Sequence, residues 1–219
     1  MCFSATASFI SGGVLTTIAV VSIIKTQSRS QLMLACIPLV FAMQQFSEGF
    51  VWIGLTDPVN LPMQTLATNL FLLFALVVWP AWVPAAFYLV EKSPKHKKIL
   101  AIISVIGFVF AILSTYYLLN YNSTASITPY HIHYELNVPY GSQTIFGIVY
   151  LVPTVLSHFV STIKRVRLLG YLIITSYAIT RLFFEDEVIS VWCFFSALIS
   201  IVIYLVLVEI NKVPTKVNG

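Results

Sequence analysis

The sequence predicts an all-α integral membrane protein, a polytopic bundle of seven transmembrane helices with the N-terminus outside and the C-terminus in the cytoplasm. Three observations predict this fold class. Hydrophobic residues make up 58% of the 219 residues and charged residues only 9%, too few to cover a soluble domain of this size. The apolar residues gather into seven long stretches. Lys and Arg occupy alternate gaps between these stretches.

A helix needs roughly 20 consecutive apolar residues to cross the hydrocarbon core of a bilayer. Seven stretches approach this length and leave no room for a second folded domain, so residues 1–219 are expected to form a single transmembrane domain. The predicted spans are residues 4–24, 31–55, 65–90, 99–119, 143–163, 168–184 and 188–209.

The individual spans carry local signals. No positively charged segment precedes the first span, and the small residues 5–7 come before its apolar core, so we do not expect a cleaved signal peptide. Pro80 and Pro84 in the third span and Pro153 in the fifth predict kinked helices. The sixth span, the shortest, runs into the acidic residues 185–187, which mark a water boundary because three consecutive acids cannot lie in hydrocarbon.

The basic residues predict the orientation, because cytoplasmic loops retain Lys and Arg. Eleven of the twelve lie in the first, third and fifth connections or after the last span. Basic charge at the cytoplasmic rim matches anionic lipid and therefore does not indicate nucleic-acid binding. The expected partners are the bilayer and a small-molecule or lipid ligand. The eleven residues are Lys25, Arg29, Lys92, Lys95, Lys97, Lys98, Lys164, Arg165, Arg167, Lys212 and Lys216.

The longest outer connection, residues 120–142, shows no periodic pattern, and long loops of this kind often act as lids. It contains His131 and His133. In an extended backbone both imidazoles face the same way and could bind one zinc ion. The alternative is a pair of loop histidines without a metal. A zinc site would need a third ligand, for which the candidates are Cys2, Glu48, Glu135 and the acids at 185–187.

Glu48 is a carboxylate inside the second span. It lies seven residues before Leu55, which at about 1.5 Å per residue places it about 10 Å below the outer end of the helix. A carboxylate at this depth normally faces the bundle interior and has a partner. Arg181 lies at a similar depth in the sixth span, so we predict a Glu48–Arg181 pair. The alternatives are that Arg181 pairs with Glu185 on its own helix or extends to the interface.

Two amides share the helical stripe of Glu48, at Gln44 and Gln45. Such a stripe forms either an interhelical hydrogen-bonded seam or one wall of a hydrated pocket in the outer half of the bundle. Asn69, early in the third span, could join either arrangement. The residues predicted to line the pocket are Gln44, Gln45, Glu48, Asn69, Arg181, Cys2 and Ser4.

The N-terminal segment allows two interpretations. Its small residues permit tight packing of the first helix. If Met1 is removed, Cys2 would instead present a free amine beside a thiol, which could bind a metal or act as a nucleophile. Cys2 and Cys193 both lie toward the oxidising face, so a disulfide between them stays open.

The opening MCFSATASF, followed by the segment FAMQQFSEGFVWIGL, resembles an uncharacterised family of bacterial multi-pass membrane proteins. The similarity covers mainly residues 1–55. The resemblance implies a multi-pass protein of the bacterial inner membrane, and it implies no particular activity. It also implies that a recurring pattern of the family includes Cys2, Ser4, Gln44, Gln45, Glu48 and Trp52.

Three functions are consistent with these observations, and the sequence favours the first. The outer pocket would bind or conduct a small ligand or ion. In the second hypothesis, the protein is a membrane-embedded, metal-dependent hydrolase of a lipid or lipid-linked substrate, with His131 and His133 on zinc and Glu48 as general base. In the third it is a sensor that needs a separate output partner. Whether the protein is an enzyme, and its oligomeric state, stay open.

Overall fold

The protein is described by a computed structural model that covers residues 4–128, 131–136, 142–183 and 196–212. Within these ranges only the backbone is described for residues 58, 142–145, 180–183 and 196–198. The described chain is mostly helical, which confirms the predicted helical fold. A described helix overlaps each of the seven predicted spans.

The described helices form seven rods in chain order. Three rods are single helices with no internal break, and a fourth is described only from residue 196 onward; the other three are assembled from shorter segments. The rods are α1 (Ala5–Ile24); a 3-10 turn (Arg29–Gln31), α2 (Leu32–Ala35) and α3 (Ile37–Thr56); α4 (Leu61–Leu73), a π-helical segment (Phe74–Val78) and α5 (Trp79–Val90); α6 (Pro94–Asn120); α7 (Ser142–Leu151), a second π-helical segment (Val152–Leu156) and α8 (Ser157–Val160); α9 (Lys164–Phe183); and α11 (Ser196–Lys212).

Length and composition allow four of these rods, within the described residues, to cross a membrane. They are Ala5–Ile24, Arg29–Thr56, Leu61–Val90 and Pro94–Asn120. Residues 146–160 form a shorter apolar helix. Each of the third and fourth rods extends upstream of its predicted span, because a proline begins α6 at Pro94 and lies at the start of α4.

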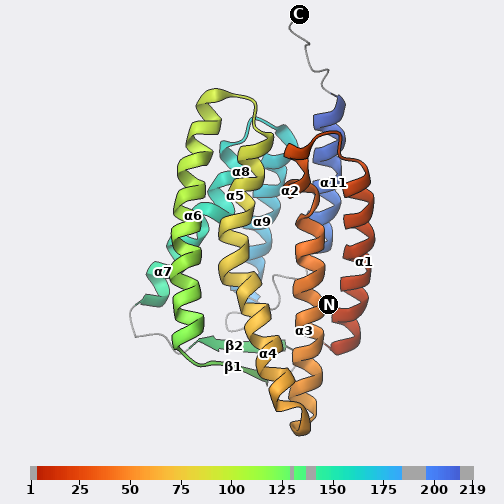
Figure 1. Ribbon diagram of the computed structural model, residues 1–219, viewed down its shortest axis with the longest axis vertical. Coiled ribbons are helices and arrows are strands. Elements are labelled where there is room, and N and C mark those ends of the chain that lie inside the picture. Colours follow the sequence, from red (N-terminus) through yellow and green to blue (C-terminus); the bar gives the residue numbers. More distant parts are fainter. Residues whose placement is uncertain (1–3, 129–130, 137–141, 184–195, 213–219) are drawn as a thin grey trace, which may run out of the picture.

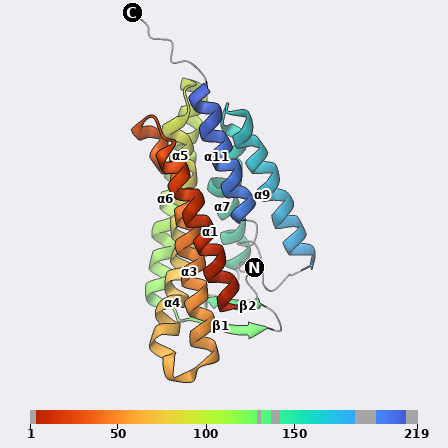
Figure 2. The ribbon, with the colours of Figure 1, turned by 90° about the vertical axis from the view of Figure 1, so that its right-hand side faces the viewer.

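The rods run alternately up and down, so their connections lie at two opposite ends (Figure 1). At one end are the connections from α1 to α2, from α5 to α6 and from α8 to α9, together with the end of α11. Most of the described Lys and Arg residues lie in or beside these segments, and we call this the basic end. The opposite end carries the α3–α4 connection and a β-hairpin, and we call it the hairpin end. Figure 2 shows α11 between α1 and α9, and α11 packs against both.

The hairpin occupies the connection for which the sequence showed no periodic pattern. Strand β1 (Ser123–Thr128) pairs antiparallel with β2 (His131–Leu136). Ile132 is fully buried in a cluster with Val51, Trp52 and Ala67, and Tyr134 also packs there. This apolar anchor explains why the segment is ordered as strands rather than as an irregular loop.

Close contacts hold the rods together. The ring of Phe9 would lie 2.9 Å from a Cβ atom at Gly49, and the ring of Phe46 would lie 2.6 Å from one at Gly12. A Cβ atom at either position would force the facing Phe ring to shift, so glycine favours the close approach of α1 and α3. On the other side of the bundle, a Cβ at Gly107 of α6 would collide with the carbonyl oxygen of Pro80.

At the basic end, the buried carboxylate of Glu91 joins two connections. It accepts hydrogen bonds from the amide and hydroxyl of Thr162 at 2.8 and 2.7 Å, from the Ser161 hydroxyl at 3.2 Å and from the Ser93 amide at 3.0 Å. Burial alone would raise the pKa of Glu91, but these hydrogen bonds stabilise the ionised form and hold the pKa below its usual value. Glu91 therefore fixes the α5–α6 connection against the α8–α9 connection.

Candidate functional site

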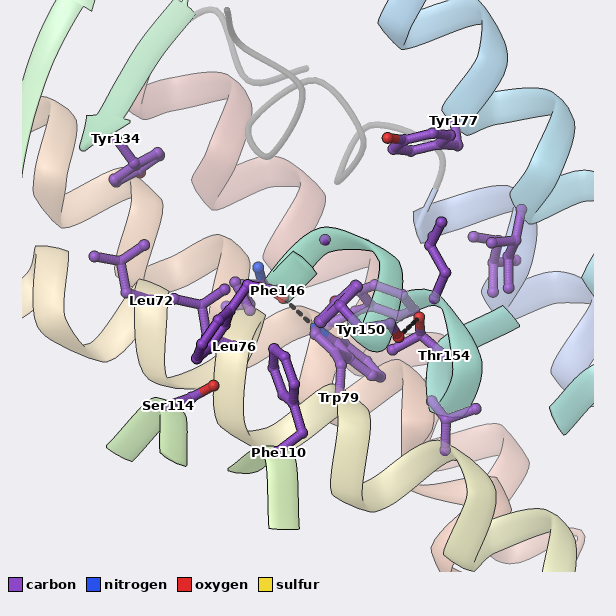
Figure 3. Close-up of a pocket in the computed structure, with 18 of the residues that line it drawn as sticks. Leu72, Leu76, Trp79, Phe110, Ser114, Tyr134, Phe146, Tyr150, Thr154 and Tyr177 are labelled. Carbon is purple, nitrogen blue, oxygen red and sulfur yellow. Dashed lines mark hydrogen bonds between the residues drawn. The ribbon is translucent and has the colours of Figure 1, made fainter. Parts of the chain in front are cut away.

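A cavity of about 570 Å³ lies inside the bundle, beneath the hairpin. Its walls come from the second to seventh rods, and residues 133–136 of β2 cover its hairpin end. In Figure 3, Tyr134 and Tyr177 lie at one end of the cavity, and Phe110, Trp79 and Thr154 lie at the other. The volume falls within the range of about 300–1,000 Å³ that is typical of small-molecule sites.

Two π-helical segments shape the walls. The segment Phe74–Val78 contributes Ala75 to the lining and leads directly into Trp79, and the segment Val152–Leu156 contributes Thr154. Both contain or precede a proline, at Pro153 and Pro80, whose missing N–H interrupts the regular helical hydrogen bonds. A π-helical turn widens a helix locally and is frequent at functional sites. The kinks expected from these prolines therefore occur as π-helical segments at the cavity.

Aromatic rings dominate the lining. Phe41 and Trp79 pack with ring centroids 4.1 Å apart. The ring of Phe110 on α6 lies 5.0 Å from that of Phe146 and 5.7 Å from that of Tyr150, both on α7. Rings in such arrangements make a rigid apolar surface that favours flat or apolar ligands. The aromatic lining residues are Phe41, Trp79, Phe110, Tyr117, Tyr134, Phe146, Tyr150 and Tyr177.

Few polar groups interrupt this surface. Gln44 Oε1 accepts a 2.7 Å hydrogen bond from the indole Nε1 of Trp79, and Thr154 donates to the Tyr150 carbonyl at 2.6 Å. The hydroxyl of Ser114 is buried and has no hydrogen-bond partner among the described residues. His158 lies at the wall nearest the basic end, where its ring makes an edge contact with Phe87 and its Nδ1 lies 3.3 Å from the Val155 carbonyl oxygen.

The structure brings some of the predicted pocket residues together. Gln44, Gln45 and Glu48 are all buried on α3, and Gln45 Nε2 donates to Glu48 Oε2 at 3.3 Å. Of these three residues, Gln44 belongs to the lining of the aromatic cavity. Gln45 and Glu48 lie beside it, on the same helix and within about one turn.

Other predicted pocket residues lie at the surface. Asn69 is exposed and accepts a 2.6 Å hydrogen bond from Ser123, so it holds β1 against α4. Ser4 is exposed and caps α1 by accepting from the Ala7 amide at 3.2 Å. Both therefore have local structural roles.

Three predictions involve residues or side chains that the structure does not describe. They concern Cys2, Cys193 and the side chain of Arg181, although the backbone of residue 181 lies in the last turn of α9. The Glu48–Arg181 pair and the Cys2–Cys193 disulfide thus stay predictions. So does a metal-binding or nucleophilic role of Cys2.

The two histidines of the predicted metal site lie on β2. His131 is opposite Thr128 and His133 is opposite Ser126, so the alternation of the strand places both imidazoles on one face. His131 is buried and His133 is partly buried. No group of three metal-ligating residues occurs within the part of the chain that the structure describes. A zinc ion stays a prediction.

Sequence reasoning missed most of the cavity. Trp79, Phe110, Ser114, Phe146 and Tyr150 come from three different rods, and nothing in their spacing along the chain shows that they meet. The prolines of the third and fifth predicted spans were the available signal, because they mark where the two π-helical segments widen the bundle.

The fold and the cavity define a helical-bundle protein whose long apolar helices are compatible with a membrane protein. The chain belongs to a family of unknown function, DUF6629, whose family model matches residues 1–218. This match agrees with the expectation that the chain belongs to an uncharacterised family. No curated protein and no solved structure matches it.

Proposed function

We propose that the protein is a seven-span membrane protein of the bacterial inner membrane that binds an apolar small molecule or lipid inside its bundle. The aromatic cavity of about 570 Å³ is the observation that carries this proposal. Tightly packed interiors rarely contain voids larger than a water molecule, so a space of this size indicates an occupant. Its lining favours an apolar ligand over permeation by an ion.

The distribution of charge supports the membrane orientation. The loops at the basic end carry Lys25, Arg29, Lys92 and Lys164 among others, which matches the cytoplasmic side of a bilayer. Large apolar side chains on the outside of the bundle, such as Ile112 on α6 at 69% exposure, suit contact with lipid. In this orientation the hairpin covers the cavity from the outside.

The polar group beside the cavity has a supporting role in this proposal. Glu48 and Gln45 are fully or almost fully buried, and Gln44 connects their helix face to the cavity wall. The polar pocket expected from the sequence is thus proposed as a hydrogen-bonded seam behind an aromatic ligand site.

Photochemical labelling in lipid nanodiscs tests ligand binding. The probe is a long-chain alcohol with a diazirine at its midpoint, and mass spectrometry locates the adducts. We expect adducts at Phe110, which is 3% exposed and lines the cavity. Lipid contact alone would label Val109 and Ile112 on the same helix, at 52% and 69% exposure. Adducts confined to these two residues would overturn the proposal.

Two glycine variants sharpen the test. Gly147 lines the cavity, and a Cβ atom there has no atom within 4 Å, so the backbone at this position accepts a side chain and Gly147→Trp adds bulk beside the cavity. Gly13 on α1 has equally open surroundings and does not line the cavity. We expect Gly147→Trp to reduce the Phe110 adduct and Gly13→Trp to leave it unchanged.

A metal-dependent hydrolase is the second candidate. It is supported by β2, which places His131 and His133 on one face and contributes His133 and Glu135 to the cavity lining. Elemental analysis of the purified protein tests it. A stoichiometric amount of zinc that is lost in His133→Ala would support the hydrolase, and its absence from the native protein would count against it.

A further inference from the structure

Ser114 differs from the other hydroxyl residues of α6. Ser104 and Thr115 each donate a 2.8 Å hydrogen bond to the carbonyl oxygen four residues earlier, at Leu100 and Ala111. This is the usual arrangement of a hydroxyl inside an apolar helix. Ser114 makes no such bond, although it is 1% exposed and its oxygen is inaccessible to solvent. A buried polar atom without a partner is uncommon and needs a physical explanation.

The cavity supplies that explanation. Ser114 lines it, between Phe110 one turn before and Tyr117 one turn after on the same face of α6. Figure 3 shows Ser114 beside Phe110 and Leu76, among the aromatic side chains of the cavity. A ligand oxygen at this position would satisfy the hydroxyl, and leaving it unsatisfied costs about 1–3 kcal/mol.

We propose that the ligand is a planar ring compound with a carbonyl or hydroxyl oxygen, such as a quinone or a phenol, whose oxygen hydrogen-bonds to Ser114. This inference rests on the proposed function, because it names the ligand of the same cavity. The rings of Phe110, Phe146 and Trp79 provide flat surfaces for offset or edge contacts with the ligand ring.

The charges around the cavity agree with an uncharged ligand. Among the described lining residues Glu135 is the one acidic side chain, and it lies on β2 at the hairpin end and is exposed. Phe110 and Tyr117 lie about one turn from Ser114 on α6, and Figure 3 shows the apolar side chain of Leu76 beside it. An ionised headgroup would lose its hydration here without gaining a counter-charge, whereas a carbonyl needs only the single donor that Ser114 provides.

Quenching of tryptophan fluorescence tests the inference on the full chain in nanodiscs. The probe is 2-methyl-1,4-naphthoquinone, a planar compound with two carbonyls. Trp79 lines the cavity, so binding is measured as the difference in quenching between the native protein and Trp79→Phe. Subtracting the quenching that remains in this variant removes the contribution of probe dissolved in lipid. We expect saturable, Trp79-dependent quenching.

Ser114→Ala and Ser104→Ala form a matched pair on one helix. Removing the hydroxyl of Ser114 should weaken quinone binding by about fivefold, the effect of one hydrogen bond. Ser104 bonds its own helix and does not line the cavity, so Ser104→Ala should leave binding unchanged. Because the Ser114 hydroxyl has no described protein partner, its removal should not lower the melting temperature in the absence of ligand.

A second probe separates the two proposals. 1,2-Dibromododecane also quenches indole fluorescence, but it has neither a ring nor an oxygen. If this probe shows saturable, Trp79-dependent quenching and the quinone does not, the ring inference is wrong and ligand binding stands. Equal quinone affinity in Ser114→Ala and in the native protein would also overturn the inference. If neither probe binds, the proposed function fails as well.

Discussion

The indole of Trp79 donates a 2.7 Å hydrogen bond to the side chain of Gln44, in a buried position at the wall of the cavity. This bond joins the second rod to the third. It also connects the two regions that matter for function, because Gln44 lines the cavity and lies one helical turn before Glu48. The polar stripe of α3 and the aromatic cavity are therefore neighbours that share one residue.

Loss of this bond should be measurable as an energetic coupling. Gln44→Leu leaves the indole N–H of Trp79 buried without its acceptor, which should lower the free energy of unfolding by about 1–3 kcal/mol. In a double-mutant cycle with Trp79→Phe, the coupling should be about 0.5–3 kcal/mol. Trp82→Phe is the control, because Trp82 donates to the Met33 carbonyl instead. Equal couplings with Trp79 and Trp82 would contradict this prediction.

Gly107 should tolerate no side chain. A Cβ atom there collides with the Pro80 carbonyl oxygen and lies 3.1 Å from Pro153 Cβ, so Gly107→Ala must displace the two kinked rods beside the cavity. We expect a loss of about 1–3 kcal/mol in the free energy of unfolding. Gly13→Ala meets open space, and alanine is the better helix former by about 1 kcal/mol, so it should be neutral or stabilising. Denaturant unfolding of both variants decides the matter, and similar stabilities would rule out the close contact.

Acid should loosen the basic end through Glu91. Its pKa is lowered in the folded protein, so the unfolded chain binds the proton more readily. The stabilisation from Glu91 is fully present above its usual pKa of 4.5 and is lost as the pH falls through the lower, folded value. Glu91→Gln should remove this part of the pH dependence, which thermal unfolding between pH 7 and pH 3 can measure. Glu135→Gln, at an exposed position, is the control, and an identical pH profile for Glu91→Gln and the native protein would refute the prediction.

Cysteine labelling in intact cells should establish the orientation. In a background without the native cysteines, Ile127→Cys on β1 and Lys95→Cys at the start of α6 place exposed thiols at opposite ends of the bundle. An impermeant maleimide should label residue 127 in intact cells and residue 95 only after permeabilisation. The reverse pattern would invert the proposed topology.

The predicted Glu48–Arg181 pair can be tested by charge removal. If the two groups pair, Arg181→Met leaves a buried carboxylate without its counter-charge, and the loss of stability should be about 3–5 kcal/mol. Adding Glu48→Gln should recover part of that loss. A double variant that is less stable than Arg181→Met would show that Glu48 has a different partner, and one that folds normally but no longer binds ligand would assign the pair to the site.

The order of residues along the chain was enough to predict which segments form helices and which ends of those helices carry positive charge. These features are local, since an apolar stretch of sufficient length favours a helix wherever it packs, and the basic residues lie between such stretches. The prolines at 80 and 153 likewise predicted breaks in their helices, and the structure has π-helical segments there.

The position of the cavity and the identity of its lining residues follow from how the rods pack against one another. Four rods contribute Phe41, Trp79, Phe110 and Phe146 to the cavity, and these rings meet because of how the rods are rotated and tilted relative to one another. The sequence does not reveal that rotation, because a helix that is apolar on all sides has no single face that must point inward. The same holds for the hairpin, whose strands are stabilised by the burial of Ile132 against Val51 and Ala67 rather than by their own pattern. The tertiary structure also places Gln44 in the cavity wall, and it places Asn69 against β1, where it accepts a hydrogen bond from Ser123.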